Sequence, residues 1–209
     1  MISSVIPFNP LDKKNLAASV TDALLSRVAE VLSQIAPFTG AGIYAIYYCG
    51  AFSAYDIAAS RNRQDPSHPV VPIYVGKAVP AGARKGALFG DAASSKALYS
   101  RLSEHAESIK ATKLDLGDFR CRYLVVDDVW IPLAESLLIG SFTPVWNSVV
   151  DGFGNHDPGR GRYEGLRPRW DVLHPGRSWA AKCQPRPESF AQIEQDVTMH
   201  LRTYSRTDC

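Results

Sequence analysis

Hydrophobic residues in the first two thirds of the chain follow two different spacings. Between residues 11 and 36 they recur at steps of three and four, which predicts a helix that ends before Pro37. A run of β-branched and aromatic residues over 43–48 predicts a first strand. Similar runs predict a second strand over 71–77 and a third over 119–126.

Further helices are predicted around the third strand and near the end of the chain. Amphipathic spacing predicts a helix over 96–110, another over 131–142 and a closing helix over 188–204. A short helical stretch is also expected near 53–60. The order strand, strand, helix, strand, helix indicates a mixed α/β or α+β core.

The length predicts a single domain over 1–209. Within it we expect an N-terminal helical segment over 1–38 and a core over 39–150 that is interrupted by an insertion over 49–72. An extension over 151–209 is rich in Gly, Pro and Arg before it ends in the closing helix.

The composition is that of a folded protein outside the membrane. Apolar residues make up 45% of the 209 residues, and the formal net charge of +2 does not by itself identify a nucleic-acid-binding protein. No apolar stretch approaches the roughly 18 residues of a membrane span, and no signal-peptide pattern is visible. The four cysteines are widely spaced, which argues against a disulfide framework or a zinc knuckle. We expect a soluble cytoplasmic protein.

Several polar side chains stand where the pattern predicts packing. Tyr44 and Tyr74 lie in the first two strands, where a tyrosine usually packs with its hydroxyl at the rim. On a helical wheel of the 96–110 segment, Arg101 and His105 fall beside or inside the apolar stripe. The structural alternative for His105 is a buried histidine that is satisfied by a backbone carbonyl.

Glu135 is the least expected of these polar residues. On the wheel of its helix it lies on the apolar face, between Ile131 at i−4 and Ile139 at i+4. A buried and unpaired charge costs several kcal/mol, so this carboxylate must be paired or bound to a metal. A structural salt bridge to Arg101 is the competing explanation.

These residues belong to a series of five motif elements. In chain order they are Gly42-Ile43-Tyr44, Tyr74-Val75-Gly76-Lys77, the helical segment from Leu98 to His105 that contains Arg101, then Glu135 and Asn147. The series resembles the GIY-YIG nuclease superfamily over residues 40–150. The resemblance implies an α+β fold with a small antiparallel β-sheet flanked by helices, and hydrolysis of nucleic-acid phosphodiesters that depends on a divalent metal ion. The second motif reads Tyr-Val-Gly, which keeps the tyrosine and the glycine.

The two tyrosines are further apart than in most of the superfamily, which makes 49–72 an insertion. The insertion, the N-terminal helix and the Arg-rich tail resemble the type II restriction endonuclease branch that reads GC-rich palindromes such as CCGCGG. This branch implies double-stranded DNA as the partner, a homodimer on the DNA, and a cognate DNA methyltransferase that acts on the same site in the bacterial cytoplasm.

Three other functions remain alternatives. A homing or repair nuclease of the superfamily usually carries a separate binding domain on a linker, for which this chain has no room. A module that only binds nucleic acid predicts the loss of a catalytic residue, and none is lost. A structural protein with coincidental motifs leaves Glu135 unexplained.

Phosphodiester hydrolysis needs an activated water, a cation at the non-bridging oxygens and charge relief at the leaving oxygen. Glu135 can hold one Mg²⁺, which accepts few protein ligands, and Arg101 offers a planar fork to the scissile phosphate. The resemblance implies that Tyr44 is the general base, with Lys77 or His105 lowering its pKa or accepting its proton. Which of these three residues takes the proton stays open.

Two more residues complete the site that the resemblance implies. Tyr74 would orient the phosphate or the attacking water. Asn147 would hydrogen-bond a phosphate oxygen or a catalytic tyrosine.

The extension is locally basic. Between Gly154 and Arg186 it holds seven basic and three acidic residues, and six of the seven are arginine, which pairs with guanine O6 and N7. The alternative is a solvated loop that Trp170 and Trp179 pack onto the core. The candidate guanine readers are Arg160, Arg162, Arg167, Arg169 and Arg177. The candidate phosphate contacts are Arg61, Arg63, Arg84 and Lys85.

Overall fold

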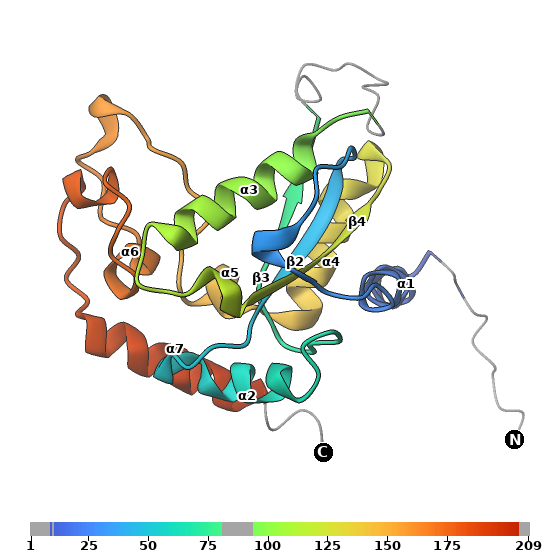
Figure 1. Cartoon of the computed structure of the whole chain (residues 1–209), viewed down its shortest axis with the longest axis horizontal. Helices are drawn as coiled ribbons and strands as arrows, with labels where there is room; N and C mark the ends of the chain where they lie inside the picture. Colours follow the sequence, from blue (N-terminus) through green and yellow to red (C-terminus); the bar gives the residue numbers. More distant parts are fainter. Residues whose placement is uncertain (1–8, 10, 81–93, 205–209) are drawn as a thin grey trace, which may run out of the picture.

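A four-stranded antiparallel sheet lies at the centre of the protein (Figure 1). The computed structural model describes residue 9 and residues 11–80 and 94–204. Each neighbouring pair of strands is antiparallel, which confirms the predicted small antiparallel sheet. In spatial order the strands are β1 (Glu30–Val31), β4 (Phe119–Val125), β2 (Gly42–Tyr48) and β3 (Pro72–Ala78).

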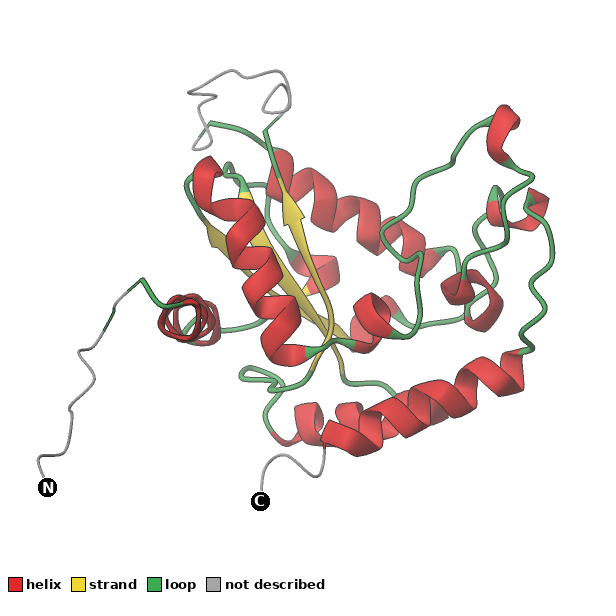
Figure 2. Cartoon of the chain, turned by 180° about the vertical axis from the view of Figure 1, so that it is seen from behind, coloured by secondary structure: helices red, strands yellow, loops and turns green. Residues whose placement is uncertain are grey.

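Helices lie on both sides of the sheet, as the α+β prediction requires (Figure 2). One face is covered by α1 (Lys13–Leu25) and α4 (Ile131–Phe142). The other face is covered by α2 (Asp56–Gln64), α3 (Ala97–Lys110), α5 (Val145–Ser148), α6 (Arg169–Leu173) and α7 (Phe190–Tyr204). Among the described residues, none of the helices combines the length and the hydrophobicity of a membrane span.

The central strand β2 is buried along its whole length. Successive side chains of a strand point to opposite faces of the sheet. Tyr44 and Ile46 therefore join the core on the α3 side, while Ile43 and Tyr47 join the core beneath α1 and α4. Burial on both faces explains why this strand reads as an almost continuous apolar run, and it directs Tyr44 towards α3.

The N-terminal segment differs from its prediction. The helix predicted over 11–36 ends at Leu25, and the chain continues into β1, where Glu30 pairs with Cys121 of β4. Leu32 then packs into the core on the α3 side. Sheet pairing overrides the helical spacing here, because the edge of β4 carries backbone groups that need partners.

The insertion and the extension join the same core as the sheet. Helix α7 packs against α2 of the insertion (Figure 1). Helix α6 forms within the Gly-, Pro- and Arg-rich part of the extension, and its Trp170 is fully buried beside Phe153. The extension is therefore part of one packed body, although much of it lacks regular secondary structure.

A buried hydrogen-bonded chain joins the insertion to the extension. The Trp146 indole Nε1 donates to the Tyr55 hydroxyl at 2.8 Å, and that hydroxyl lies 2.6 Å from His174 Nε2. A hydroxyl can accept one hydrogen bond and donate another, so Tyr55 can accept from the indole and donate to Nε2 of a neutral His174 ring. Burial lowers the pKa of His174 to about 3, in agreement with this arrangement.

We predict that His174 makes the stability of the fold depend on pH. Its pKa is near 6.5 in the unfolded chain and is depressed in the folded protein, so its contribution is complete above about pH 6.5 and is lost as the pH falls towards 3. One such proton gives a slope of about 1.4 kcal/mol per pH unit. His174→Gln, which keeps polar atoms near Tyr55, should remove about one proton from the slope measured by urea unfolding between about pH 6 and pH 4.5. An unchanged slope would contradict this role.

Candidate active site

The two motif tyrosines lie side by side on the two central strands. Tyr44 of β2 is the register partner of Gly76 of β3, and the ring centroids of Tyr44 and Tyr74 are 6.2 Å apart. A Cβ atom at position 76 would overlap the hydroxyl of Tyr44 and come within 3.0 Å of the Tyr74 ring. The glycine of the second motif is therefore required by the space that Tyr44 fills.

Tyr44 forms a buried hydrogen bond with His105 of α3. Its hydroxyl lies 2.6 Å from Nε2 of the His105 ring, and the exposed fraction is 1% for each residue. His105 belongs to the buried stripe of α3, as the wheel predicts, but its partner is a tyrosine hydroxyl and not a backbone carbonyl.

Burial determines the protonation of this pair. It raises the pKa of Tyr44 well above 10, and the neighbouring Tyr74 raises it further, while Arg101 opposes the shift. Burial also lowers the pKa of His105 well below 6.5, as does the positive charge of Arg101. Near neutral pH the pair therefore consists of a phenol and a neutral imidazole, which can share a proton along the bond.

Arg101 of α3 reaches the same place from the other side. Its Nη1 donates to Glu104 Oε2 at 2.8 Å and lies 2.6 Å from Nε2 of His156, while its Nη2 donates to the Gly154 carbonyl at 2.6 Å. The structural alternative, a salt bridge between Arg101 and Glu135, is not the pairing that forms. Three groups hold this guanidinium at the cleft wall, and only 20% of the side chain is exposed.

Glu135 of α4 pairs with Lys77 of β3. The distance from Lys77 Nζ to Glu135 Oε2 is 2.7 Å, and the exposed fractions of the two side chains are 39% and 20%. The carboxylate on the apolar face is thus paired at the cleft wall. Because the pair is partly open to solvent, it holds little net energy and can exchange partners.

These side chains line one cleft of about 750 Å³. His105 lies behind Tyr44, at the closed end of the site. The predicted residues at the cleft wall are Tyr44, Tyr74, Lys77, Arg101 and Glu135.

Asn147 forms its hydrogen bonds within the protein to the backbone of β3. Its side-chain oxygen accepts from the Val75 amide at 2.8 Å, and its Nδ2 donates to the Val75 carbonyl at 2.8 Å. Both hydrogen bonds go to the backbone of β3, between Tyr74 and Gly76, and none to a tyrosine hydroxyl. The side chain of Asn147 thus makes the two backbone hydrogen bonds that a neighbouring strand would make with β3. These bonds fix the backbone of the second motif.

Two of the cleft-wall residues that the sequence prediction does not include bind Arg101. Glu104 and His156 both contact Arg101, and the distance from His156 Nε2 to Glu104 Oε2 is 3.8 Å. Glu104 stands one helical turn from Arg101, a spacing that the sequence displays. His156 has no such signal, because the extension brings it to the cleft from far along the chain.

The arginines of the extension differ in their surroundings. Arg167 donates to the Ala180 carbonyl at 3.1 Å, and Arg169 donates to the Val149 carbonyl at 2.7 Å and pairs with Asp196. Both side chains thus bind protein groups, and a contact with a guanine edge would require them to exchange these partners.

Arg177 and Arg162 differ most in solvent exposure: Arg177 is buried and Arg162 is exposed. Arg177 is 7% exposed and is enclosed by protein groups, so a base contact would require it to leave the core. Arg162 is exposed and lines a second cleft of about 450 Å³ that shares Gly154 and His156 with the first. The side chain of Arg160 lies outside the described part of the chain.

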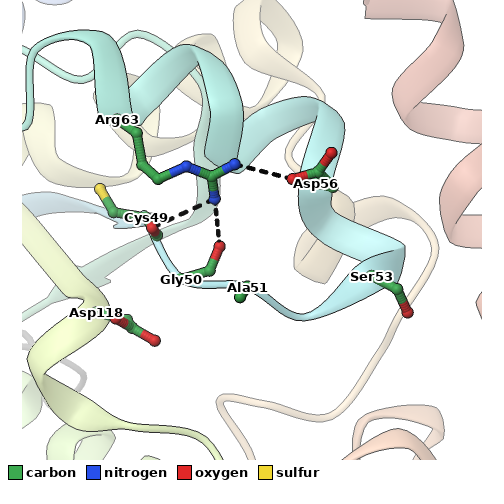
Figure 3. Close-up of a pocket in the computed structure, with 7 residues that line it drawn as sticks. All are labelled: Cys49, Gly50, Ala51, Ser53, Asp56, Arg63 and Asp118. Carbon is green, nitrogen blue, oxygen red and sulfur yellow. Dashed lines mark hydrogen bonds and ion pairs between the residues drawn. The ribbon is translucent and has the colours of Figure 1, made fainter.

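The candidate phosphate contacts fall into two groups. Arg61 and Arg63 lie on α2, and Arg63 donates to the Gly50 carbonyl at 2.5 Å and to Asp56 at 2.9 Å, beside a pocket of the insertion (Figure 3). The guanidinium of Arg63 thus links the loop after β2 to the first turn of α2. Arg84 and Lys85 lie outside the described residues.

We predict that Gly76→Ala destabilises the protein by about 1–3 kcal/mol, because the new methyl group meets the Tyr44 hydroxyl. Gly140→Ala is the matched control: a Cβ at this exposed helical position meets nothing within 4 Å, so stability should rise by up to about 1 kcal/mol. Urea unfolding measures both changes. In a Tyr44→Phe background the cost of Gly76→Ala should shrink, and equal costs in the two backgrounds would refute the overlap.

Comparison with known families agrees with the geometry of this site. The family model of the Eco29kI GIY-YIG domain matches residues 36–201. No curated protein matches the chain. A restriction endonuclease domain of this kind hydrolyses DNA at specific sites, so the fold, the cleft and the family agree. The chain therefore belongs to the Eco29kI family of GIY-YIG restriction endonucleases.

Proposed function

We propose that the protein is a type II restriction endonuclease that cleaves both strands of a GC-rich palindrome such as CCGCGG with one Mg²⁺ per active site. The observation that carries the proposal is the buried Tyr44–His105 hydrogen bond beside Arg101 and Glu135 in one cleft. In the cell the enzyme would act in the bacterial cytoplasm together with a DNA methyltransferase of the same specificity.

The cleft fits a single hard cation. Glu135 offers a carboxylate at the cleft wall, and the described residues contain no group of three or more His, Cys, Asp and Glu that could hold a metal. Mg²⁺ keeps most of its waters and often binds through one or two carboxylates plus substrate phosphate oxygens, so one carboxylate suffices. When bound, the ion would neutralise charge on the phosphate and lower the pKa of a coordinated water.

Tyr44 and His105 can activate the attacking water without a free phenolate. In the proposed step the water gives a proton to the Tyr44 hydroxyl oxygen, and Tyr44 gives its own proton to His105 Nε2. The water oxygen bonds to phosphorus, the bond from phosphorus to the leaving oxygen breaks, and solvent protonates the leaving oxygen. Burial opposes a lasting phenolate on Tyr44, and it also opposes a lasting imidazolium on His105. The relay therefore needs the negative charge of the bound phosphate to stabilise the proton on His105 while the reaction proceeds.

Arg101 and Lys77 supply positive charge on opposite sides of the tyrosines. Arg101 is held by Glu104 and His156 in partly exposed contacts, which a phosphate can replace at little cost. Lys77 can release Glu135 to a cation and turn to the phosphate itself. Tyr74, with its hydroxyl at the same wall, would orient the phosphate or the water.

The direct test is cleavage of plasmid DNA with Mg²⁺. We expect discrete fragments from the wild type, none with a chelator, and none from Glu135→Gln, which should still bind DNA and fold. Tyr44→Phe should lower the rate by about 10²–10⁴, the usual contribution of a general base. Tyr47→Phe is the matched control, because it removes a hydroxyl from the opposite face of the same strand.

The outcomes separate the alternatives. Nicking alone would contradict cleavage of both strands, and binding without cleavage would point to a non-catalytic module. Full activity of Tyr44→Phe would mean that Lys77 or His105, and not Tyr44, accepts the proton of the water.

For recognition we propose Arg162 as a guanine reader. Its exposed guanidinium lines the second cleft, which continues from the catalytic cleft through Gly154 and His156. A chain with one active site must act as a two-fold dimer to cut both strands of a palindrome, so each copy would read one half-site.

Arg162→Ala should therefore lower the ratio of cognate to single-mismatch affinity. The difference in binding free energy between the two duplexes should shrink by about 1–3 kcal/mol. Arg27→Ala, an exposed arginine beyond the end of α1, should leave the ratio unchanged. Titration of labelled duplexes gives both the ratio and the number of protein copies per duplex. An unchanged ratio for Arg162→Ala would contradict this assignment, and one copy per cognate duplex would contradict the dimer.

A further inference from the structure

Arg177 is the most deeply buried of the extension's arginines whose side chains the structure describes. Its Nε donates to Asp171 Oδ1 at 2.7 Å and its Nη2 lies 2.5 Å from Asp171 Oδ2, while both residues are buried. Its guanidinium carbon lies 4.6 Å from the ring centroid of Trp170 and 4.7 Å from that of Trp179. The ion pair and the two indoles fix the plane of the guanidinium.

The remaining hydrogen bonds of Arg177 go to one short loop. Nη2 donates to the Gly152 carbonyl at 2.8 Å, and Nη1 donates to the carbonyls of Phe153 and Asn155 at 3.1 Å each. The carbonyl left between them, that of Gly154, accepts from Arg101 at 2.6 Å. Two arginines therefore share the four consecutive carbonyls of residues 152–155, one from the core of the extension and one from the cleft.

The same loop touches two other groups of the active site, His105 and Tyr74. The Phe153 ring stacks on His105, with centroids 4.5 Å apart and planes inclined by 17°, and it meets the Tyr74 ring edge-on at 5.0 Å. His156, the next residue after the loop, lies 2.6 Å from Arg101. A shift of this loop would move groups around His105, Tyr74 and Arg101 together.

We propose that Arg177 is a positioning residue of the endonuclease, which acts through the loop 152–155 to hold Arg101 at the scissile phosphate. This inference rests on the proposed function, because it assigns Arg101 to the phosphate. The guanidinium of Arg177 has the geometry to order the loop carbonyls, and the loop in turn orders Arg101. A displacement of about 1 Å at such a group can cost about 10²-fold in rate.

The first test compares Arg177→Lys with Arg122→Lys. Arg122 is the matched control. It is buried and binds the Arg27 and Pro69 carbonyls, its guanidinium carbon lies 5.2 Å from the centroid of the Tyr47 ring, and it is not among the described residues that line the cleft. We expect Arg177→Lys to lower the single-turnover cleavage rate about 10–100-fold, with cognate affinity and the cognate-to-mismatch ratio unchanged. Arg122→Lys should lose thermal stability without this loss of rate.

A double-mutant cycle then identifies the route. If Arg177 acts through Arg101, Arg177→Lys should cost far less in rate in an Arg101→Lys background than in the wild type. Gly154→Ala supplies a second variant that leaves Arg177 in place, because its Cβ would lie 2.6 Å from the Tyr74 hydroxyl and 3.2 Å from Arg101 Nη2. It should reproduce the rate loss at unchanged cognate affinity, whether or not Arg177→Lys folds.

Three results would overturn the inference. They are additive rate losses for the pair of Arg177 and Arg101, an equal rate loss in Arg122→Lys, and a changed cognate-to-mismatch ratio in Arg177→Lys, which would make it a base reader. A wild type that leaves DNA intact would instead refute the proposed function, so the two failures are distinguishable.

Discussion

Tyr44 needs space in the middle of the sheet, and that need constrains three other elements. Its register partner on β3 must be Gly76, because any Cβ there would meet the phenol hydroxyl. On α3 the residue that faces this hydroxyl must accept or donate a hydrogen bond, and the buried His105 does so at 2.6 Å. Asn147 then pins the strand that carries Gly76 by pairing with the backbone of Val75. The reactive groups thus lie on regular elements packed into the core, where their positions are held by the same contacts that hold the fold.

Charge in the cleft is balanced by pairs of modest strength. Glu135 faces Lys77 and Glu104 faces Arg101, and these side chains remain partly open to solvent. Partly exposed ion pairs contribute little net stability, so they can be exchanged for contacts to a phosphate or a cation. The buried pair of Tyr44 and His105 differs, because burial keeps both groups neutral near neutral pH. In the proposed mechanism the open pairs would give way to phosphate and cation, while the buried pair would transfer the proton.

The arginines of the extension serve two physical purposes that composition does not separate. Arg177 is an interior residue whose hydrogen bonds are taken by a carboxylate and three carbonyls, and it shapes the loop beside Arg101. Arg162 is exposed next to the catalytic cleft. An irregular segment needs buried donors for its carbonyls, because no helix or strand satisfies them, and a planar guanidinium can serve several at once. A local excess of arginine is therefore partly a structural requirement of this extension.

The sequence by itself determined the core strands, the core helices and the inward placement of His105 and Glu135, because side-chain spacing follows from local backbone geometry. The order of the motifs also identified the family. Tertiary structure alone decided the partners within the protein: Lys77 and not Arg101 for Glu135, and the loop carbonyls for Arg177. It also turned residues 26–36 from helix into the edge strand and the turn that follows it. Each side chain pairs with groups that folding brings near it and leaves unpaired, and these groups lie far away along the chain. The spacing of residues in the sequence does not indicate which distant groups come together.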